Sequence, residues 1–134
     1  MGDKTAFVTG ATGFLGLNLV EVLLEGGWHV TALHRPSSDC SRLQGLNVEL
    51  VEGDILDRDS LKAAIPPGVD AVFHVAADTS MWSRAAARQE RINVDGTRNV
   101  IAAAIERRAG RMIHTSTIAV YGFQDGIITE ESPR

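Results

Sequence analysis

The segment Thr9–Gly16, which reads TGATGFLG, has the residue types of a phosphate-binding turn, with Gly10, Gly13 and Gly16 evenly spaced along it. Glycines let a backbone turn tightly and approach a ligand closely. The apolar run Thr5–Val8 precedes the turn and an amphipathic run follows it. The N–H groups and positive dipole end of the helix that starts there would face an anion. The pattern favours nucleotide binding, and a plain structural turn is the alternative, because glycine is also the ordinary turn residue.

Alternating strand and helix signals surround this turn and position it. Strands are expected at residues 4–9, 28–33, 47–51, 69–76 and 111–116, and helices at residues 13–25, 41–44, 58–65 and 83–108. The helix at 41–44 is short and weak, whereas Asp57 is a good N-cap for the helix at 58–65. Strands that alternate with helices predict a parallel sheet with helices on both faces.

The predicted fold class is α/β, a Rossmann-type, doubly wound parallel sheet of about five strands in three layers. Right-handed crossovers and a dinucleotide-type arrangement give the strand order 3-2-1-4-5. The ligand crevice then lies at the carboxyl ends of the first and fourth strands, where the strand order reverses. The glycine turn and the segment His74–Ala77 are expected to meet there.

Length and composition restrict the class of protein. The chain of 134 residues has the length of one domain, so residues 1–134 are expected to form a single dinucleotide-binding domain. A net charge of -4 and an isoelectric point near 5.5 give no electrostatic footprint for nucleic acid or an anionic membrane. The sequence shows no signal peptide and no membrane-spanning run, which favours a cytoplasmic protein. The histidines lack metal-ligand spacing, so no metal site is expected.

The C-terminal region, residues 117–134, is loop-like and ends without a closing helix. A doubly wound nucleotide fold usually has a sixth strand, and here the fifth strand would be an edge. We therefore expect a domain truncated on its C-terminal side, without the last strands and without a substrate lobe. An exposed strand edge and uncovered apolar surface favour self-association, so a homo-oligomer is an open alternative.

Five motifs in order resemble those of the extended short-chain dehydrogenase/reductase family, which includes NAD-dependent epimerase/dehydratases and dihydroflavonol-4-reductase-like enzymes. The resemblance covers nearly the whole chain. The motifs are Thr9–Gly16, Gly53–Asp57 with Ser60 and Leu61, His74–Ala77, Asn93–Asn99 and Thr115–Gly122. The stretch Ala77–Trp82 is closer to the dihydroflavonol-reductase-like branch, although packing is the expected role of Trp82 itself.

The resemblance implies roles for individual residues. The three glycines would hold the pyrophosphate, and Asp54 with Ile55 would flank the adenine. Asn93 would stabilise its helix against the fourth strand. Thr117 would be the catalytic hydroxyl that bonds the reacting oxygen of a small-molecule substrate; a plain strand-end hydroxyl is the alternative. His74 is expected to be a hydrogen-bonded strand-end histidine rather than a catalyst. The cofactor-binding candidates from the motifs are Gly10, Thr12, Gly13, Phe14, Leu15, Gly16, Asp54, Ile55, Ala76, Ala77, Thr79, Asn93 and Thr115.

The end of the second predicted strand bears on the choice of cofactor. NAD-preferring folds place a carboxylate there, on the ribose 2′-hydroxyl. Here His34 is followed by Arg35, Ser37 and Ser38, with no carboxylate before Asp39. An arginine and a hydroxyl can bind a 2′-phosphate. The sequence therefore adds His34, Arg35 and Ser38 to the cofactor site and favours NADP over NAD; an NAD site that lacks a 2′-hydroxyl acceptor is the alternative.

One departure from the family pattern limits the predicted activity. The family uses a Tyr-x-x-x-Lys pair, but the single tyrosine, Tyr121, has Asp125 at the fourth position after it, and the only lysines are Lys4 and Lys62. We predict that this chain is the NAD(P)-binding domain of an oxidoreductase or epimerase and is inactive alone. The expected substrates of the parent are sugar-nucleotide, flavonoid-like or steroid-like alcohols or carbonyls. The alternative is a non-catalytic NAD(P)-binding sensor or regulatory module.

Overall fold

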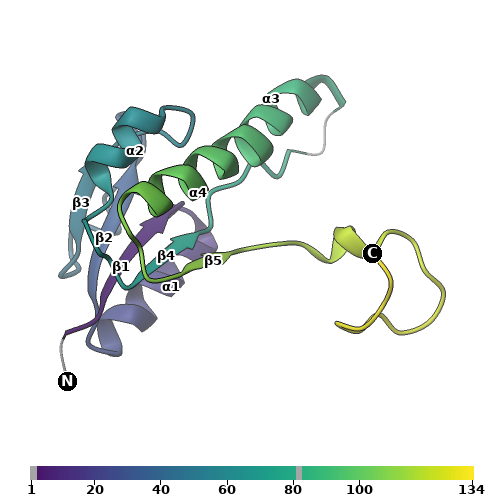
Figure 1. Cartoon of the computed structure of the whole chain (residues 1–134), viewed down its shortest axis with the longest axis horizontal. Coiled ribbons are helices and arrows are strands. Elements are labelled where there is room, and N and C mark those ends of the chain that lie inside the picture. Colours follow the sequence, from purple (N-terminus) through teal and green to yellow (C-terminus); the bar gives the residue numbers. More distant parts are fainter. Residues whose placement is uncertain (1–2, 81–82) are drawn as a thin grey trace.

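The computed structural model of the chain describes residues 3–80 and 83–134, so Met81 and Trp82 lie outside the described residues. Strands and helices alternate along the chain as the sequence predicts (Figure 1). The main elements are β1 (Thr5–Thr9), α1 (Phe14–Glu25), β2 (His29–His34), β3 (Glu49–Glu52), α2 (Arg58–Ala64), β4 (Ala71–His74), α3 (Ala86–Glu90), α4 (Thr97–Glu106) and β5 (Met112–His114).

The sheet has five parallel strands in the order β3-β2-β1-β4-β5, which confirms the predicted topology. Strand β1 is central because it pairs with β2 on one side and β4 on the other. Phe7 lies at the middle of both pairings, opposite Thr31 of β2 and Val72 of β4. The reversal of strand order thus falls between β1 and β4, at the place expected for a ligand crevice.

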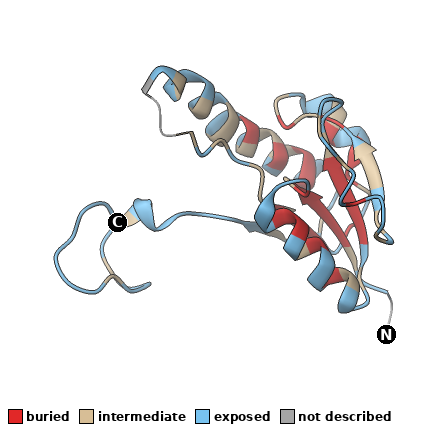
Figure 2. Cartoon of the chain, turned by 180° about the vertical axis from the view of Figure 1, so that it is seen from behind, coloured by how far each residue is buried: buried red, intermediate tan, exposed pale blue. Residues whose placement is uncertain are grey.

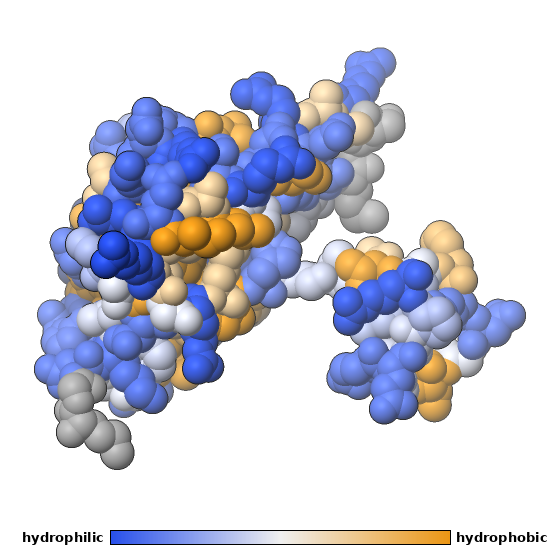
Figure 3. All heavy atoms as spheres, viewed as in Figure 1, coloured by the Kyte–Doolittle hydropathy of each residue, from blue (hydrophilic) through white to orange (hydrophobic). Residues whose placement is uncertain are grey.

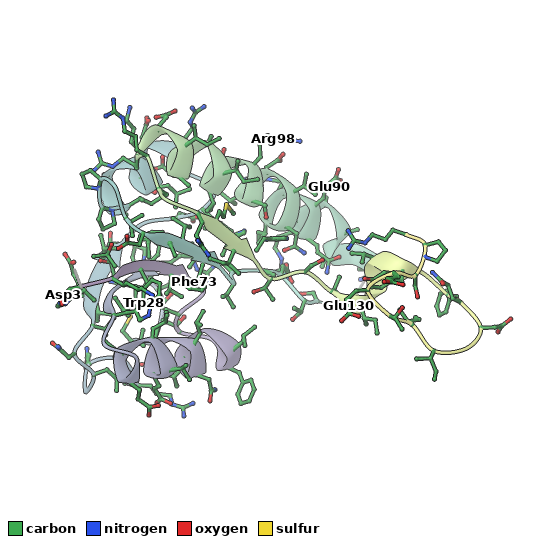
Figure 4. The ribbon with its side chains drawn as sticks, turned by 60° about the horizontal axis from the view of Figure 1, so that its bottom comes forward. Asp3, Trp28, Phe73, Glu90, Arg98 and Glu130 are labelled. Carbon is green, nitrogen blue, oxygen red and sulfur yellow. The ribbon has the colours of Figure 1, made fainter. Side chains whose placement is uncertain are left out.

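Helices cover both faces of the sheet and bury an apolar core on each, so the predicted three layers are confirmed (Figures 2 and 4). Phe7 and Val72 point toward α2 and α4, whereas Ala6 and Val8 point toward α1. Successive strand residues face opposite sides, which explains why the strands of a sheet covered on both faces are continuously apolar. On the α1 side, the rings of Trp28 and Phe73 meet edge to face, 6.2 Å apart (Figure 4).

The long helix expected at residues 83–108 is divided into segments of different helical type. A 3-10 turn at Ser83–Ala85 leads into α3, a π-helical segment occupies Arg91–Gly96, and α4 follows. The backbone stays helical at the junctions, and the segments form one continuous rod (Figure 1). No helix in the described part of the chain is long and apolar enough to cross a membrane.

The prediction of a short helix at residues 41–44 is wrong, because this segment forms consecutive turns. The N–H groups of Leu43 and Gln44 both donate to the carbonyl oxygen of Cys40, at 2.9 and 3.1 Å, and Gly45 follows directly. Such a short segment has too few backbone hydrogen bonds to offset the cost of helix nucleation. By contrast, the predicted N-cap of α2 is confirmed, because the Asp57 carboxylate accepts the N–H groups of Asp59 and Ser60.

Beyond β5 the chain leaves the sheet as an extended arm that ends in a loop (Figure 1). The predicted loop character is confirmed, apart from a 3-10 turn at Ile118–Tyr121. The arm exposes Phe123 and Ile127, and Figure 3 shows apolar atoms at its surface as well as on the body of the domain. Strand β5 pairs with β4 on one side and forms an edge of the sheet.

Candidate functional site

A cavity of about 860 Å³ opens at the carboxyl ends of the strands, around the switch point between β1 and β4. It is formed by the loops that follow β1, β2, β3 and β4, together with one face of the α3 helix and the segment after it. The structure brings most of the predicted cofactor residues to this cavity. Those that line it are Gly10, Thr12, Gly13, Phe14, Leu15, Gly16, His34, Arg35, Ser38, Asp54, Ile55, Ala76, Ala77 and Thr79.

Close backbone contacts explain two of the three glycines in the β1–α1 turn. Gly10 has a φ of +72°, and a Cβ built on it would lie 2.6 Å from the backbone nitrogen of Ala76. A Cβ on Gly16 would lie 2.0 Å from the carbonyl oxygen of Gly10. Both positions therefore require glycine, because real Cβ atoms do not approach backbone atoms so closely. Gly13 is different, since its φ is -84° and its Cβ would be 3.4 Å from the nearest neighbour.

The N-terminus of α1 opens toward this cavity. Its N-cap, Gly13, supplies no side-chain cap, and the first intrahelical bond runs from the N–H of Leu17 to the carbonyl oxygen of Gly13 at 2.9 Å. The N–H groups of Phe14, Leu15 and Gly16 precede that bond, so they belong to the orphan donors of a helix start. With the positive end of the helix dipole, these groups form a site suited to a phosphate or other anion.

The loop after β3 forms another wall of the cavity, and α4 holds it in place. The Asp54 carboxylate accepts the N–H of Leu56 at 2.8 Å, which fixes the turn that carries Ile55. The side-chain amide of Asn99 donates to the Ile55 carbonyl oxygen at 3.0 Å. Gly96 allows the helical rod to approach, because a Cβ there would lie 2.7 Å from the Ile55 side chain.

At the end of β2 a tight turn presents polar groups to the cavity. The N–H of Arg35 donates to Ser38 Oγ at 3.2 Å, and the N–H of Ser38 donates to the Arg35 carbonyl oxygen at 2.9 Å. His34 Nδ1 donates to the same carbonyl oxygen at 3.1 Å. Asp39 accepts the N–H of Ser41 in the next turn and is not a lining residue. The guanidinium of Arg35 is therefore the charged group that this corner offers to a ligand.

The wall after β4 is held by a buried group of polar side chains. His74 lies at the end of β4 and is 1% exposed. Its Nδ1 is 2.7 Å from the hydroxyl of Thr9, and its Nε2 is 2.9 Å from the hydroxyl of Thr97. The Thr9 hydroxyl also accepts the N–H groups of Val75 and Ala76, both at 3.2 Å. The expected hydrogen bonding of His74 at the end of its strand agrees with this geometry.

Burial, with a smaller contribution from the neighbouring His114, lowers the pKa of His74 from 6.5 to about 4. The two imidazole rings stack with their centroids 5.4 Å apart. A charged His74 would have to lose its hydration in a buried site beside a second imidazole. His74 is therefore neutral in the folded protein at neutral pH.

Farther along this wall, both the backbone and the carboxylate of Asp78 form hydrogen bonds with side chains of the helical rod. Asn93 accepts the backbone N–H of Asp78 at 2.7 Å and donates to its carbonyl oxygen at 2.9 Å. Gln89 donates to the carbonyl oxygens of Asp78 and Ser80. The Asp78 carboxylate accepts from the Ser80 hydroxyl and from Arg88 Nε, and these hydrogen bonds, with that of Ser80 first, lower the pKa of Asp78.

Three predicted residues are not brought to the cavity lining. The amide of Asn93 is occupied by the backbone of Asp78, and the N–H of Thr115 donates to the His74 carbonyl oxygen at 3.0 Å. Both residues thus act on the site through the backbone they contact. Thr117 is exposed on the arm, where its hydroxyl accepts the N–H of Ala119 at 3.2 Å.

Several lining residues were missed by the sequence interpretation. Six of them are direct chain neighbours of predicted residues, namely Leu33, Gly53, Leu56, Val75, Asp78 and Ser80. Asp78 and Ser80 belong to the loop after the HVAA motif, and Arg88 and Ile92 face the cavity from the helical rod. The four-residue spacing of Arg88 and Ile92 places them on one helix face, and that spacing was the signal that could have identified them.

Comparisons with known proteins identify the group to which this architecture belongs. A parallel sheet in the order 3-2-1-4-5 with a glycine turn at its switch point defines a Rossmann-type domain. The chain belongs to the NAD dependent epimerase/dehydratase family, whose profile matches residues 6–134. The predicted family resemblance is thus confirmed.

Individual relatives agree with this assignment. A Synechocystis protein whose name places it among the dihydroflavonol 4-reductases is 43% identical over 127 residues, which are 94% of this chain and 36% of that protein. Sterol demethylase protein B of Methylococcus capsulatus is 46% identical over 122 residues, which are 88% of this chain and 36% of that protein. The chain therefore spans about a third of the length of these relatives.

A solved structure extends the likeness to three dimensions. A short-chain dehydrogenase/reductase superfamily protein from Agrobacterium tumefaciens, with bound NAD, is 32% identical and matches with a TM-score of 0.80. The match covers 96% of this chain and 38% of that protein.

Substitution of Gly16 by alanine should destabilise the fold far more than substitution of Gly13. Gly16→Ala forces a Cβ into the Gly10 carbonyl oxygen, and overpacking of this kind costs about 3 kcal/mol. Gly13→Ala meets ordinary van der Waals distances at an ordinary φ, so it should cost only the loss of a preferred N-cap residue, about 0.5–1 kcal/mol. Urea unfolding of both variants checks this, and equal stabilities would contradict the close-contact explanation.

The stability of the domain should fall as the pH is lowered through the titration range of His74. Its folded pKa of about 4 lies below its unfolded value of 6.5, so the unfolded state binds more protons between these values. The free energy of unfolding should decrease by about 2 kcal/mol between pH 7.5 and pH 5 because of this residue. Urea unfolding of the parent and of His74→Gln measures the difference, and an equal pH dependence in both would contradict it.

Proposed function

We propose that this chain is the cofactor-binding part of an NAD(P)-dependent oxidoreductase or epimerase. The observation that carries the proposal is the glycine turn, which packs against Ala76 at the switch point and presents the open N-terminus of α1 to the cavity. A side chain at Gly10 or Gly16 would collide with backbone atoms of the turn or of the wall after β4, so these glycines allow the turn to keep this shape. The donors at this helix start suit the pyrophosphate of a dinucleotide.

Each wall of the cavity has a proposed part in holding the dinucleotide. The N–H groups of residues 14–16 would bind the pyrophosphate, with Thr12 beside them. The Asp54 carboxylate would accept the exocyclic amine of adenine, and Ile55 would pack against its ring. Ala76 and Ala77 would let the cofactor lie close to the backbone, with Thr79 as a further hydroxyl. When bound, the nicotinamide would accept or deliver the hydride.

The reaction is proposed to take place at an alcohol or carbonyl group of a small molecule. The names of relatives point to a flavonoid-like or steroid-like compound, and the family also includes epimerases, which makes a sugar nucleotide a further class. Thr117 is the proposed catalytic hydroxyl, which would bond the reacting oxygen. Its place on the arm beyond β5 follows the carboxyl end of the strand that neighbours β4.

We propose NADP as the preferred dinucleotide, because Arg35 is the charged group at the end of β2 and Ser38 lies in the same turn. NADPH should therefore bind more tightly than NADH. Arg35→Gln should weaken NADPH about tenfold or more and leave NADH nearly unchanged, since one arginine–phosphate interaction is lost. Arg42→Gln is the matched control, because Arg42 is an exposed cation that does not line the cavity. Fluorescence titrations with both cofactors measure this, and tighter binding of NADH would reverse the assignment.

The chain of 134 residues should show no appreciable turnover by itself, because it lacks the Tyr-x-x-x-Lys pair of the family. The measurement is the absorbance of NADPH during incubation with flavonoid, steroid and sugar-nucleotide carbonyl compounds. We expect cofactor binding without steady oxidation of NADPH. Steady reduction of any of these carbonyl compounds would contradict the prediction and would leave the binding proposal intact.

A further inference from the structure

We propose that His74 is a positioning residue for the dinucleotide. His74 acts through a series of hydrogen bonds that runs in one direction, from the α4 helix to the backbone of Val75 and Ala76. The inference rests on the proposed function, because it assigns a task to the wall of the proposed cofactor cavity. It goes beyond that function in assigning a role to side chains that do not line the cavity, namely Thr9, His74 and Thr97.

The position of each proton in this series of hydrogen bonds follows from the fixed acceptor at one end and the fixed donors at the other. The Thr97 hydroxyl lies 2.7 Å from the carbonyl oxygen of Asn93, an acceptor only, so Thr97 donates there. Thr97 Oγ1 must then accept from His74, at 2.9 Å, which places the imidazole proton on Nε2. His74 Nδ1 carries a lone pair and accepts the Thr9 hydroxyl proton at 2.7 Å.

Thr9 connects His74 to the backbone of the cavity wall. With its own proton on His74, the Thr9 hydroxyl uses its lone pairs to accept the N–H groups of Val75 and Ala76, both at 3.2 Å. A hydroxyl has one proton and two lone pairs, so every hydrogen-bonding capacity of Thr9 is used. The Nε2–H tautomer of His74 is therefore the form that satisfies all the groups in the chain.

The backbone of Val75 and Ala76, which this series of hydrogen bonds holds in place, also contacts the glycine turn. A Cβ at Gly10 would lie 2.6 Å from the Ala76 nitrogen, so the two segments are in direct contact. A displaced Ala76 would shift against Gly10 and change the width of the cavity between the turn and the wall. The hydrogen bonds of Thr9 and His74 thus set the distance between two parts of the site that would hold the dinucleotide.

Paired substitutions at two positions separate positioning from simple packing. Thr97→Val keeps the shape and removes the acceptor of Nε2–H, whereas Thr97→Ser keeps the hydroxyl. His74→Leu removes both ring nitrogens, whereas His74→Gln can still accept from Thr9 and donate to Thr97. Arg98→Gln is a surface control on the same helix, where Arg98 pairs with Asp95 at the surface.

The experiment uses the full chain and measures the Kd for NADPH and for NADH by fluorescence, with circular dichroism to select conditions in which each variant is folded. Thr97→Val and His74→Leu should raise the Kd for both cofactors about tenfold, which corresponds to the loss of one buried hydrogen bond. Thr97→Ser, His74→Gln and Arg98→Gln should stay within about twofold of the parent, a change well under that of one hydrogen bond. Nitrogen NMR of the parent should show the neutral Nε2–H form of His74.

The outcomes separate the two proposals. Unchanged affinity in folded Thr97→Val, or an Nδ1–H form of His74 in the parent, would overturn the positioning role. If His74→Leu does not fold, the Thr97 pair and the NMR signal still decide the question. If the parent chain binds neither cofactor, the proposed function itself fails, whereas binding by the parent with equal affinity in all the variants overturns only the positioning role.

Discussion

The contact between the glycine turn and the end of β4 is the constraint on which the rest of the site depends. The Gly10 backbone, at a φ of +72°, lies so close to Ala76 that a Cβ would come within 2.6 Å of its nitrogen. This proximity is possible because β1 and β4 are paired neighbours whose carboxyl ends meet at the same edge. The turn, the helix start and the wall after β4 can therefore face one ligand.

The helical rod that packs on the sheet forms hydrogen bonds with two walls of the cavity, the loop after β3 and the loop after β4. Asn93 binds the backbone of Asp78 on one side, and Asn99 binds the carbonyl oxygen of Ile55 on the other. Between them, Gly96 allows close approach to Ile55, and Thr97 bonds to His74. Within the motif around Asn93, the side chains of Asn93 and Asn99 thus each hold a loop of the cavity, and Thr97 holds the histidine at the end of β4.

Much of the fold and most of the cavity lining were predictable because they rest on local patterns. Apolar runs separated by helical periods predict a parallel sheet, and the glycine turn marks the first crossover. The errors have a common origin, because they concern weak local signals. Residues 41–44 form turns because so short a segment has too few backbone hydrogen bonds to offset helix nucleation, and apolar periodicity does not distinguish the π-helical segment near Asn93 from α-helix.

The sequence by itself determined the strand order, the glycine turn, the cap at Asp57 and the family, since each is encoded in residue types at short spacing. Only the tertiary structure decided that Asn93 contacts Asp78 and not the cavity, and that Arg88 faces the cavity. The same holds for His74, whose partners Thr9 and Thr97 are distant along the chain. Burial and hydrogen-bond direction depend on which segments meet in space, and short-range patterns do not encode those meetings.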